Sequence, residues 1–275
     1  MHKFEVPYNF EPDYLPYLEQ NKDLLPWVKF IYMASWKEDG INTRKNTILE
    51  KYYPKTWQGY LYHLRILQRY ADVCILIQKS STIDIVDKYY NLGIRYFILN
   101  DDSLAKQLKY TYADIHITLS VTRWSTKALL EKLECDLYDN IVLPFIYNRH
   151  IDYIKQLPVQ HKYVLLVNNE CYYNCDHHDI HWYLQADTIE EFCEKEDKLC
   201  YSYCREIRKK EQNRTFVNPE DLQYFDPYIS SYKLVDRTAP SQFIFNDLRA
   251  FALRKNDLVL AMHNDIGEAF YNVED

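Results

Sequence analysis

Residues 95–111 read RYFILNDDSLAKQLKYT. Within the first six residues, YFIL (96–99) forms a short apolar run of aromatic and branched side chains, which is typical of a strand buried on both faces. Asn100 and Asp101 interrupt this run, and the apolar residues that follow recur at helical spacing. Asp101 stands where a helix N-cap is expected, because its carboxylate can accept from the free backbone N–H groups of the first helical turn. The stretch therefore predicts one strand, one polar turn and one helix.

The same unit recurs along most of the chain. Helix-like stretches lie at 56–70, 81–93, 101–111 and 125–136, and Gly93 supplies a C-terminal stop for the second of them. Alternation of apolar strands with helices indicates a parallel sheet. Eight units predict an α/β fold of the (β/α)8 TIM-like barrel type, and an open doubly wound sheet is the alternative. The eight strand-like runs are KFEV (3–6), VKFIYMA (28–34), VCILIQ (73–78), RYFILN (95–100), IHITLSV (115–121), NIVLPF (140–145), YVLLVN (163–168) and SYKLVD (231–236).

Composition limits the classes of function. The chain has 275 residues, of which 47% are hydrophobic, and it contains no run of about 18 apolar residues that could span a bilayer. Its net charge of −7 gives no general attraction to nucleic-acid phosphates, and the basic cluster at 205–214 is most simply a solvated surface. Neither a GxGxxG nor a P-loop motif is present. We expect one barrel domain over 1–275, cytoplasmic and without membrane association, since the first residues do not resemble a signal peptide.

Polar residues follow several predicted strands. In a barrel the carboxyl ends of the strands carry the chemistry, because the loops there form one concave face. Some of these residues must be helix N-caps, as Ser125 could be. Together they predict a polar bowl, in which Arg44, Arg123 or Arg237 could clamp a carboxylate or a phosphate. The strand-end residues are Ser35, Gln78, Ser80, Ser81, Asn100, Asp101, Asp102, Ser120, Thr122, Arg123, Asn168, Asn169, Glu170, Asp236 and Arg237.

Residues 165–185, LLVNNECYYNCDHHDIHWYLQ, place a cluster of cysteines and histidines directly after the seventh predicted strand. Seven cysteines without a secretory signal favour reduced thiols or metal ligands over paired disulfides. Cys171 and Cys175 would rise from the open end of the barrel, and we expect 171–215 to form a metal-binding insertion. Both zinc and a 4Fe–4S cluster stay open. The further candidate ligands are Cys193, Cys200, Cys204 and His181.

Simpler explanations exist for parts of this cluster. Cys74 lies within a predicted strand and fits a small core residue, and Cys193 has helical spacing to Cys200 and could merely pack. The histidines could be ordinary surface residues. The third cysteine that a CxxxCxxC radical-SAM motif requires is missing, and no signature of a cysteine protease is present.

Two long segments resemble peptidase U32-like barrel proteins. NNECYYNCDHHDIHWY (168–183) is similar to the family pattern NNxCxYxCPxRxxHY, and FVNPEDLQYFDPYISSYKLVDRTAPSQFI (216–244) is similar to WIRPEDLxYYxxxGIxxFKIxGRTxPxxxI. A weaker similarity covers IYMASWKEDGINTR (31–44). The resemblance implies a (β/α)8-like barrel. It also implies either peptidase activity, after which members were named, or an iron–sulfur protein that takes part in oxygen-independent hydroxylation of RNA or of quinone precursors.

The resemblance carries over residue by residue, with departures. Asp176 stands where the family has a proline, and His178 stands where it has an arginine. Asp236 replaces the glycine before Arg237. The extra carboxylate of Asp176 would oppose adding electrons to a cluster, or would favour zinc. The matching residues are Cys171, Cys175 and His181 in the first motif, Cys204 before the second, and Pro219, Glu220, Asp221, Leu222, Lys233, Arg237, Thr238 and Pro240 within it.

Three functions follow as hypotheses. In the first, a 4Fe–4S cluster supports a redox or hydroxylation-type modification of a small molecule, peptide or RNA bound in the bowl. In the second, a catalytic zinc with Glu170 or Asp176 as base hydrolyses peptides, although no HExxH helix is present. In the third, a structural metal clamps the loop and the chain is a non-catalytic binding subunit, paired with a related barrel.

Overall fold

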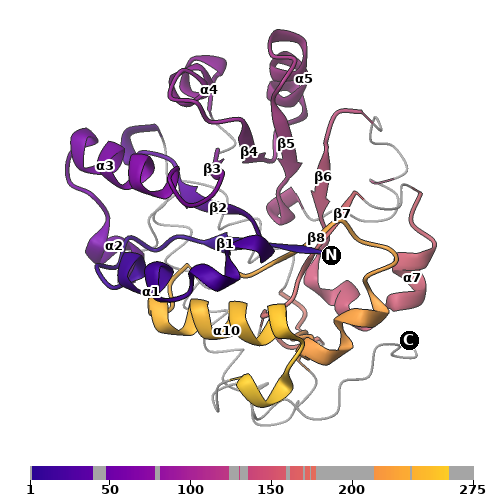
Figure 1. Cartoon of the computed structure of the whole chain (residues 1–275). Helices are drawn as coiled ribbons and strands as arrows, with labels where there is room; N and C mark the ends of the chain where they lie inside the picture. The colour runs from indigo at the N-terminus through magenta and orange to yellow at the C-terminus, as the bar shows by residue number, and fades with distance from the viewer. Residues whose placement is uncertain are drawn as a thin grey trace.

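The chain folds into a closed barrel of parallel strands. The computed structural model describes residues 2–39, 48–77, 81–123, 130, 136–158, 162–169, 171–173, 175–177, 214–235 and 237–259. Within these residues the strands pair in sequence order, and β8 pairs with β1 to close the ring (Figure 1). The TIM-like barrel predicted from the sequence is confirmed, and the open sheet is excluded. The strands are β1 (Lys3–Pro7), β2 (Val28–Ala34), β3 (Val73–Leu76), β4 (Tyr96–Leu99), β5 (His116–Leu119), β6 (Asn140–Val142), β7 (Tyr163–Leu166) and β8 (Ser231–Lys233).

Helices alternate with the strands and cover the outside of the barrel (Figure 1). The predicted helices at 56–70, 81–93 and 101–111 are confirmed as α3, α4 and α5, whereas most of the predicted 125–136 helix lies outside the described residues. The described α-helices are α1 (Tyr14–Gln20), α2 (Ile48–Tyr52), α3 (Trp57–Leu67), α4 (Ile83–Tyr90), α5 (Asp102–Thr111), α7 (Ile151–Lys155) and α10 (Ser241–Leu253). The described 3-10 helices are η1 (Lys22–Trp27), η2 (Lys37–Asp39), η3 (Val121–Arg123), η4 (Phe145–Arg149), η5 (Pro219–Tyr224) and η6 (Asn256–Leu258).

Two predicted helix ends are confirmed by their hydrogen bonds. The Asp101 side chain accepts from the backbone N–H of Leu104 at 2.9 Å and so caps α5. Gly93 has a φ of 88°, a left-handed conformation that favours glycine, and its N–H donates to the carbonyl of Tyr90 at 2.9 Å just after α4. Ser125 lies outside the described residues. The turns that separate the β/α units are therefore specified by local residues.

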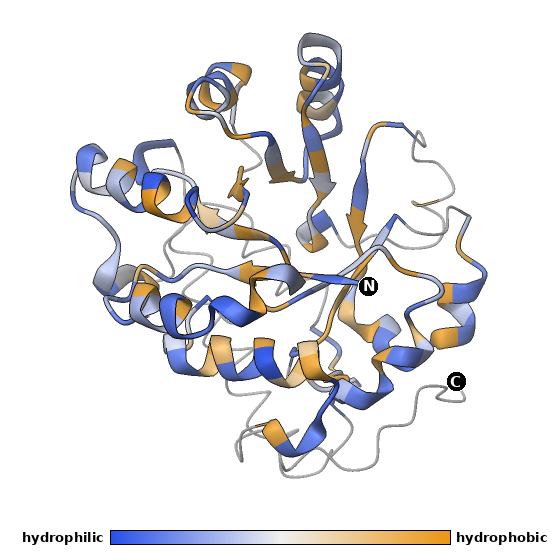
Figure 2. Cartoon of the chain, in the orientation of Figure 1, coloured by the Kyte–Doolittle hydropathy of each residue, from blue (hydrophilic) through white to orange (hydrophobic). Residues whose placement is uncertain are grey.

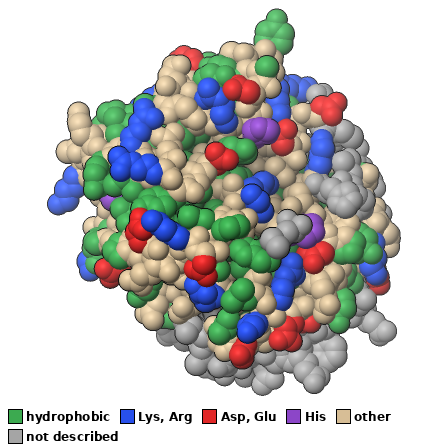
Figure 3. All heavy atoms as spheres, in the orientation of Figure 1, with side chains coloured by type: hydrophobic (Ala, Val, Ile, Leu, Met, Phe, Trp, Pro, Cys, Tyr) green, Lys and Arg blue, Asp and Glu red, His purple; other side chains and the backbone are tan. Residues whose placement is uncertain are grey.

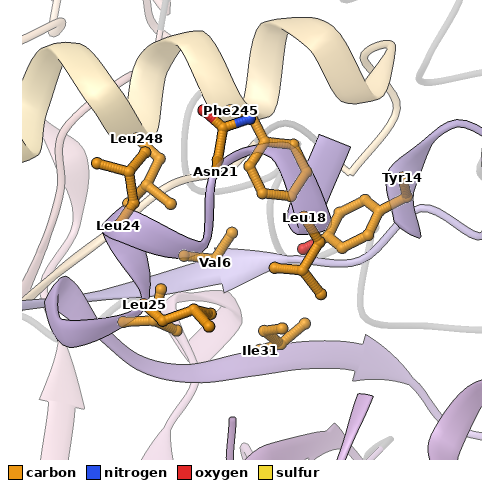
Figure 4. Close-up of a pocket in the computed structure, with 10 residues that line it drawn as sticks. Val6, Tyr14, Leu18, Asn21, Leu24, Leu25, Ile31, Phe245 and Leu248 are labelled. Carbon is orange, nitrogen blue, oxygen red and sulfur yellow. The ribbon is translucent and has the colours of Figure 1, made fainter. Parts of the chain in front are cut away.

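Helix α10 seals the barrel on the side of β1 and β2. Phe245 and Leu248 project from α10 toward Leu18 of α1 and Val6 of β1 (Figure 4). The space between these side chains totals about 220 Å³, but it is divided into gaps that are each too narrow for a water molecule, and its lining is mostly apolar. Hydrophobic and hydrophilic residues alternate along α10, as expected for a helix with one face on a core (Figure 2). This gap is a packing feature and not a ligand site.

Apolar side chains also fill the inside of the barrel. One cluster contains Phe30, Tyr32, Cys74 and Ile98, all from strands β2 to β4. Cys74 is fully buried there, so its predicted role as a core residue is confirmed. A second apolar cluster lies on the β6 and β7 side and contacts the loop after β7. It consists of Val121, Val142, Phe145, Val164 and Leu166, with Ile146, Cys171 and Val235 packed against it.

Neither a membrane span nor a broad basic face is seen in the described part of the chain. No described helix is long and apolar enough to cross a bilayer. On the face shown in Figure 3, lysine and arginine side chains are interspersed with aspartate and glutamate. That face has no single basic area of the kind that binds a phosphate backbone. Most of the basic cluster at 205–214 lies outside the described residues.

Candidate site at the carboxyl end of the barrel

A pocket opens inside the barrel at the carboxyl ends of the strands; we call it the mouth pocket. It is bounded by residues of β2, β3, β4, β6, β7 and β8 and by residues that follow β5 and β8, and its empty volume of about 540 Å³ includes solvent on its open side. In barrels this end carries the functional residues. The lining residues are Tyr32, Leu76, Ile98, Ser120, Val121, Thr122, Val142, Leu166, Lys233, Val235 and Arg237.

Lys233 connects the mouth pocket to an ionic cluster deeper in the barrel. Its Nζ donates to Glu5 at 3.4 Å and lies 3.9 Å from the centre of the Tyr32 ring. The Glu5 carboxylate is fully buried and also accepts from Lys29 Nζ at 3.2 Å and from Ser231 Oγ at 3.0 Å. Burial lowers the pKa of Lys233, and the charge of Glu5 opposes that shift. Glu5 therefore fixes the Lys233 amine beside the pocket.

Arg237 brings a second cation to the pocket. It follows β8 and is partly exposed, and no described residue accepts a hydrogen bond from its guanidinium or forms an ion pair with it. Burial lowers the pKa of Arg237 from its ordinary value, and nearby Tyr32 opposes the shift. A guanidinium carries five N–H donors. Those of Arg237 are available to a ligand in the pocket.

Hydroxyl groups line the pocket at the end of β5. Asn100 Nδ2 donates to Thr122 Oγ1 at 3.2 Å, and Thr122 Oγ1 donates to Ser120 Oγ at 3.0 Å. The Oδ1 atom of Asn100 is buried and has no hydrogen-bond partner among the described residues. This short chain gives the pocket polar groups opposite β8. It also confirms that some of the strand-end residues gather at one place.

Cys171 and Cys175 lie in a short turn at the edge of the mouth pocket. Both residues are half-buried, and neither forms a disulfide with another described cysteine. The turn is held by backbone bonds from Thr215 N–H to the Cys171 carbonyl at 2.9 Å and from Cys175 N–H to the Tyr172 carbonyl at 3.3 Å. Cys171 packs against the second apolar cluster, of which three members also line the pocket. The position of Cys171 agrees with the expectation that this thiol lies near the open end of the barrel.

The remaining predicted site residues fall into two groups. Arg123 is placed beside α5, where its guanidinium donates to Asp102 at 2.9 Å, and it is not among the residues that line the mouth pocket. The others lie outside the described residues, so their proposed roles stay predictions. No group of three or more metal-binding side chains occurs in the part of the chain that the structure describes. The undescribed candidates are Arg44, Glu170, His181, Cys193, Cys200 and Cys204.

Two strand-end asparagines hold the barrel together. Asn168 donates to Asp247 of α10 at 2.9 Å and accepts from the backbone N–H of Val235 at 2.8 Å. Asn169 accepts from the N–H of Cys171 at 2.8 Å. These two residues therefore position β8, α10 and the cysteine turn, and they do not line the pocket.

Sequence reasoning did not assign a role to the Glu5 and Lys233 pair. A signal was present, because each charged residue interrupts an otherwise apolar run, in KFEV and in SYKLVD. A charge within a strand buried on both faces needs a partner. Pairing Lys233 with Glu5 across the closure of the barrel supplies that partner.

Closed parallel strands with a charged pocket at their carboxyl ends define the chain as a TIM-like barrel protein. The chain matches no family model. It is 25% identical over 167 residues to an uncharacterized protease of Methanocaldococcus jannaschii. The matched region covers 58% of this chain and half of that relative's length. Similar solved structures are a U32 peptidase, Mk0906, and a conserved Enterococcus faecalis protein of unknown function.

The two structural likenesses are distant. The U32 peptidase is 15% identical with a TM-score of 0.45, and the match covers 70% of this chain and 79% of that one. The E. faecalis protein is 13% identical with a TM-score of 0.46, and the match covers 92% and 65%. The first carries the name of the family that the two sequence motifs resemble. The chain is shown to be a TIM-like barrel by its own closed ring of strands, and the family stays a resemblance that the two sequence motifs carry.

Proposed function

We propose that the chain is an iron–sulfur-dependent modifying enzyme, or a subunit of one, whose metal centre lies at the edge of the mouth pocket. The observation that supports this is the position of Cys171. Its side chain packs against the second apolar cluster, and three members of that cluster, Val121, Val142 and Leu166, also line the pocket. A metal bound by this thiolate would stand beside any substrate in the pocket.

The chemistry of the donors fits such a centre. Cys171 and Cys175 present two thiols from one turn that backbone hydrogen bonds hold in place. Cys204 would supply a third ligand, with Cys200, Cys193 or His181 as the fourth. Thiolates are the usual donors to iron–sulfur clusters and to structural zinc. When bound, a 4Fe–4S cluster supplies electron transfer at low potential. Zinc is the alternative metal.

The described residues would bind and orient the substrate. Arg237 and Lys233 would hold an anionic group, and the hydroxyls of Ser120 and Thr122 would contact polar atoms. The apolar wall would exclude water from the reacting part of the substrate. The pocket is a hollow enclosed by the strand ends, which suits one small group or side chain and not a folded domain.

The test compares cysteines in two environments. Cys171→Ala and Cys74→Ala each remove one thiol, but Cys74 is buried inside the barrel and far from the turn in sequence. Purified without oxygen, the wild type and Cys74→Ala should retain the metal, and Cys171→Ala should lose it. Thermal unfolding of the same samples checks that the barrel persists. A colourless wild type that contains no iron would end the iron–sulfur proposal, and bound zinc in its place would favour the alternative metal.

The same variants separate catalysis from a structural role. If Cys171→Ala stays folded but no longer modifies a substrate that the wild-type protein modifies, the metal centre is catalytic. If metal loss only lowers the unfolding temperature and leaves ligand binding unchanged, the chain is a binding subunit with a structural metal. A related barrel subunit would then be sought by co-purification.

Metal-dependent peptide hydrolysis is the second candidate. It is favoured by the curated relative, whose name describes it as a protease. Asp176 is exposed beside the cysteine turn and could act as the base, as could Glu170. The described residues that line the mouth pocket include no carboxylate, which weakens this candidate. Incubation of metal-loaded protein with a peptide library tests it, and absence of cleavage would exclude it.

A further inference from the structure

We infer that the mouth pocket binds a small organic carboxylate with an apolar body, its charged end on Arg237 and Lys233. This inference rests on the proposed function only in taking the mouth pocket as the substrate site. It does not require that the cysteines hold a metal. Three observations carry it: the balance of charge inside the barrel, the unpaired guanidinium, and the aliphatic wall.

Among the described side chains in and below the mouth pocket, three cations, Lys29, Lys233 and Arg237, stand against one anion, Glu5. Glu5 already accepts from both Lys29 and Lys233, at 3.2 and 3.4 Å. No described carboxylate lies among the pocket-lining residues to balance Arg237. Two cations at one low-dielectric site repel each other unless an anion joins them. A bound anion would complete the pocket electrostatically.

The Arg237 guanidinium needs acceptors. No described residue accepts a hydrogen bond from it, although burial lowers its pKa. Because Arg237 is partly exposed, its donors are open to the pocket, and a ligand that fills the pocket must supply acceptors for them. A carboxylate matches the planar guanidinium, because its two oxygens can accept two parallel N–H bonds. The amine of Lys233, fixed by Glu5, would contact the same ligand group.

Six of the eleven described residues that line the pocket are aliphatic. Leu76, Ile98 and Val142 come from three different strands and face the same space. Beyond the two cations, the polar side chains among the described lining residues are Ser120, Thr122 and Tyr32, and the Tyr32 hydroxyl already donates to the Leu234 carbonyl. So few polar groups favour one singly charged end and an apolar body over a heavily charged phosphate.

The experiment uses three matched probes on the full-length protein. Phenylacetate, phenylacetamide and benzylphosphonate share one apolar body and differ in the end group. By calorimetric titration we expect phenylacetate to bind once per chain, and at least about tenfold more tightly than the uncharged amide. Arg237→Gln should weaken phenylacetate binding by roughly 10- to 100-fold. Arg95→Gln is the matched control, because Arg95 pairs with Asp114 on the surface at the other end of β4.

Each other outcome overturns the inference. Equal affinities for phenylacetamide and phenylacetate would show that the pocket does not recognise the negative charge. A folded Arg237→Gln variant that binds phenylacetate as tightly as the wild type would show that Arg237 does not bind the carboxylate. Tighter binding of benzylphosphonate would identify a phosphate site and refute the carboxylate. Phenylacetate binding by metal-free Cys171→Ala separates the two proposals: retained binding supports this inference whether or not the metal proposal holds.

Discussion

The buried carboxylate of Glu5 offers the sharpest test of the barrel interior. It accepts from Lys29, Lys233 and Ser231, and it is fully buried. Glu5→Gln keeps the shape but removes the charge, so the Lys233 ammonium, with 8% of its side chain exposed, loses its anion. Removing one partner of a buried ion pair costs roughly 3–5 kcal/mol. We expect a loss near the lower figure, about 3 kcal/mol, because Lys29 keeps 21% of its side chain in water.

Urea unfolding measures this loss as a change in the free energy of unfolding. Asp152→Asn is the control, because it breaks an exposed ion pair with Lys155 at 2.7 Å and should cost less than about 0.5 kcal/mol. The double variant Glu5→Gln with Lys233→Met should be more stable than Glu5→Gln alone, since it removes the unpaired ammonium as well. If Glu5→Gln loses less than about 1 kcal/mol, or if the second substitution restores nothing, the reasoning about this pair is refuted.

Three further substitutions test local features of the fold. Gly93→Ala should lower the free energy of unfolding by roughly 1–2 kcal/mol, because the φ of 88° is unfavourable for a residue with a Cβ atom, and a loss of a few tenths would contradict this. Asp101→Ala removes the cap that accepts from Leu104 and should cost about 1 kcal/mol in the same assay, whereas Asp101→Asn should retain most of it. Burial lowers the pKa of His63, whose Nδ1 lies 2.5 Å from the Tyr8 hydroxyl, so the unfolded chain binds this proton more readily. The contribution of the neutral His63 to the free energy of unfolding should therefore be fully present above pH 6.5, the ordinary pKa, and should be lost as the pH falls toward the lower pKa of the folded state. His63→Gln should reduce this loss of stability at low pH, and a variant with the same pH dependence as the wild type would count against this role of His63.

The strands could be predicted because burial on both faces leaves a continuous apolar run. All eight predicted runs contain a strand, but several strands end earlier than the runs. The run 140–145 illustrates the reason: β6 is Asn140–Val142, and Pro144 has no N–H to continue the ladder. Apolar residues beyond the strand end then line the loops and the pocket instead of joining the sheet.

The candidate site was predicted only in part. The strand-end rule placed Arg237 and Cys171 near the open end of the barrel, because topology alone brings the carboxyl ends of the strands together. The residue to which a given strand-end side chain bonds depends on how the helices and loops pack, and the position of that side chain at a strand end does not predict it. Asn168 bonds Asp247, which is 79 residues away, and Arg123 bonds Asp102 in the preceding unit.

The central claim, a thiolate-bound metal beside the mouth pocket, is tested most directly by chemical analysis of wild-type protein prepared without oxygen. We predict about four iron and four sulfide per chain, with visible absorption that bleaches on reduction. Protein that contains neither iron nor zinc under these conditions, while folded and able to bind phenylacetate, would contradict the claim.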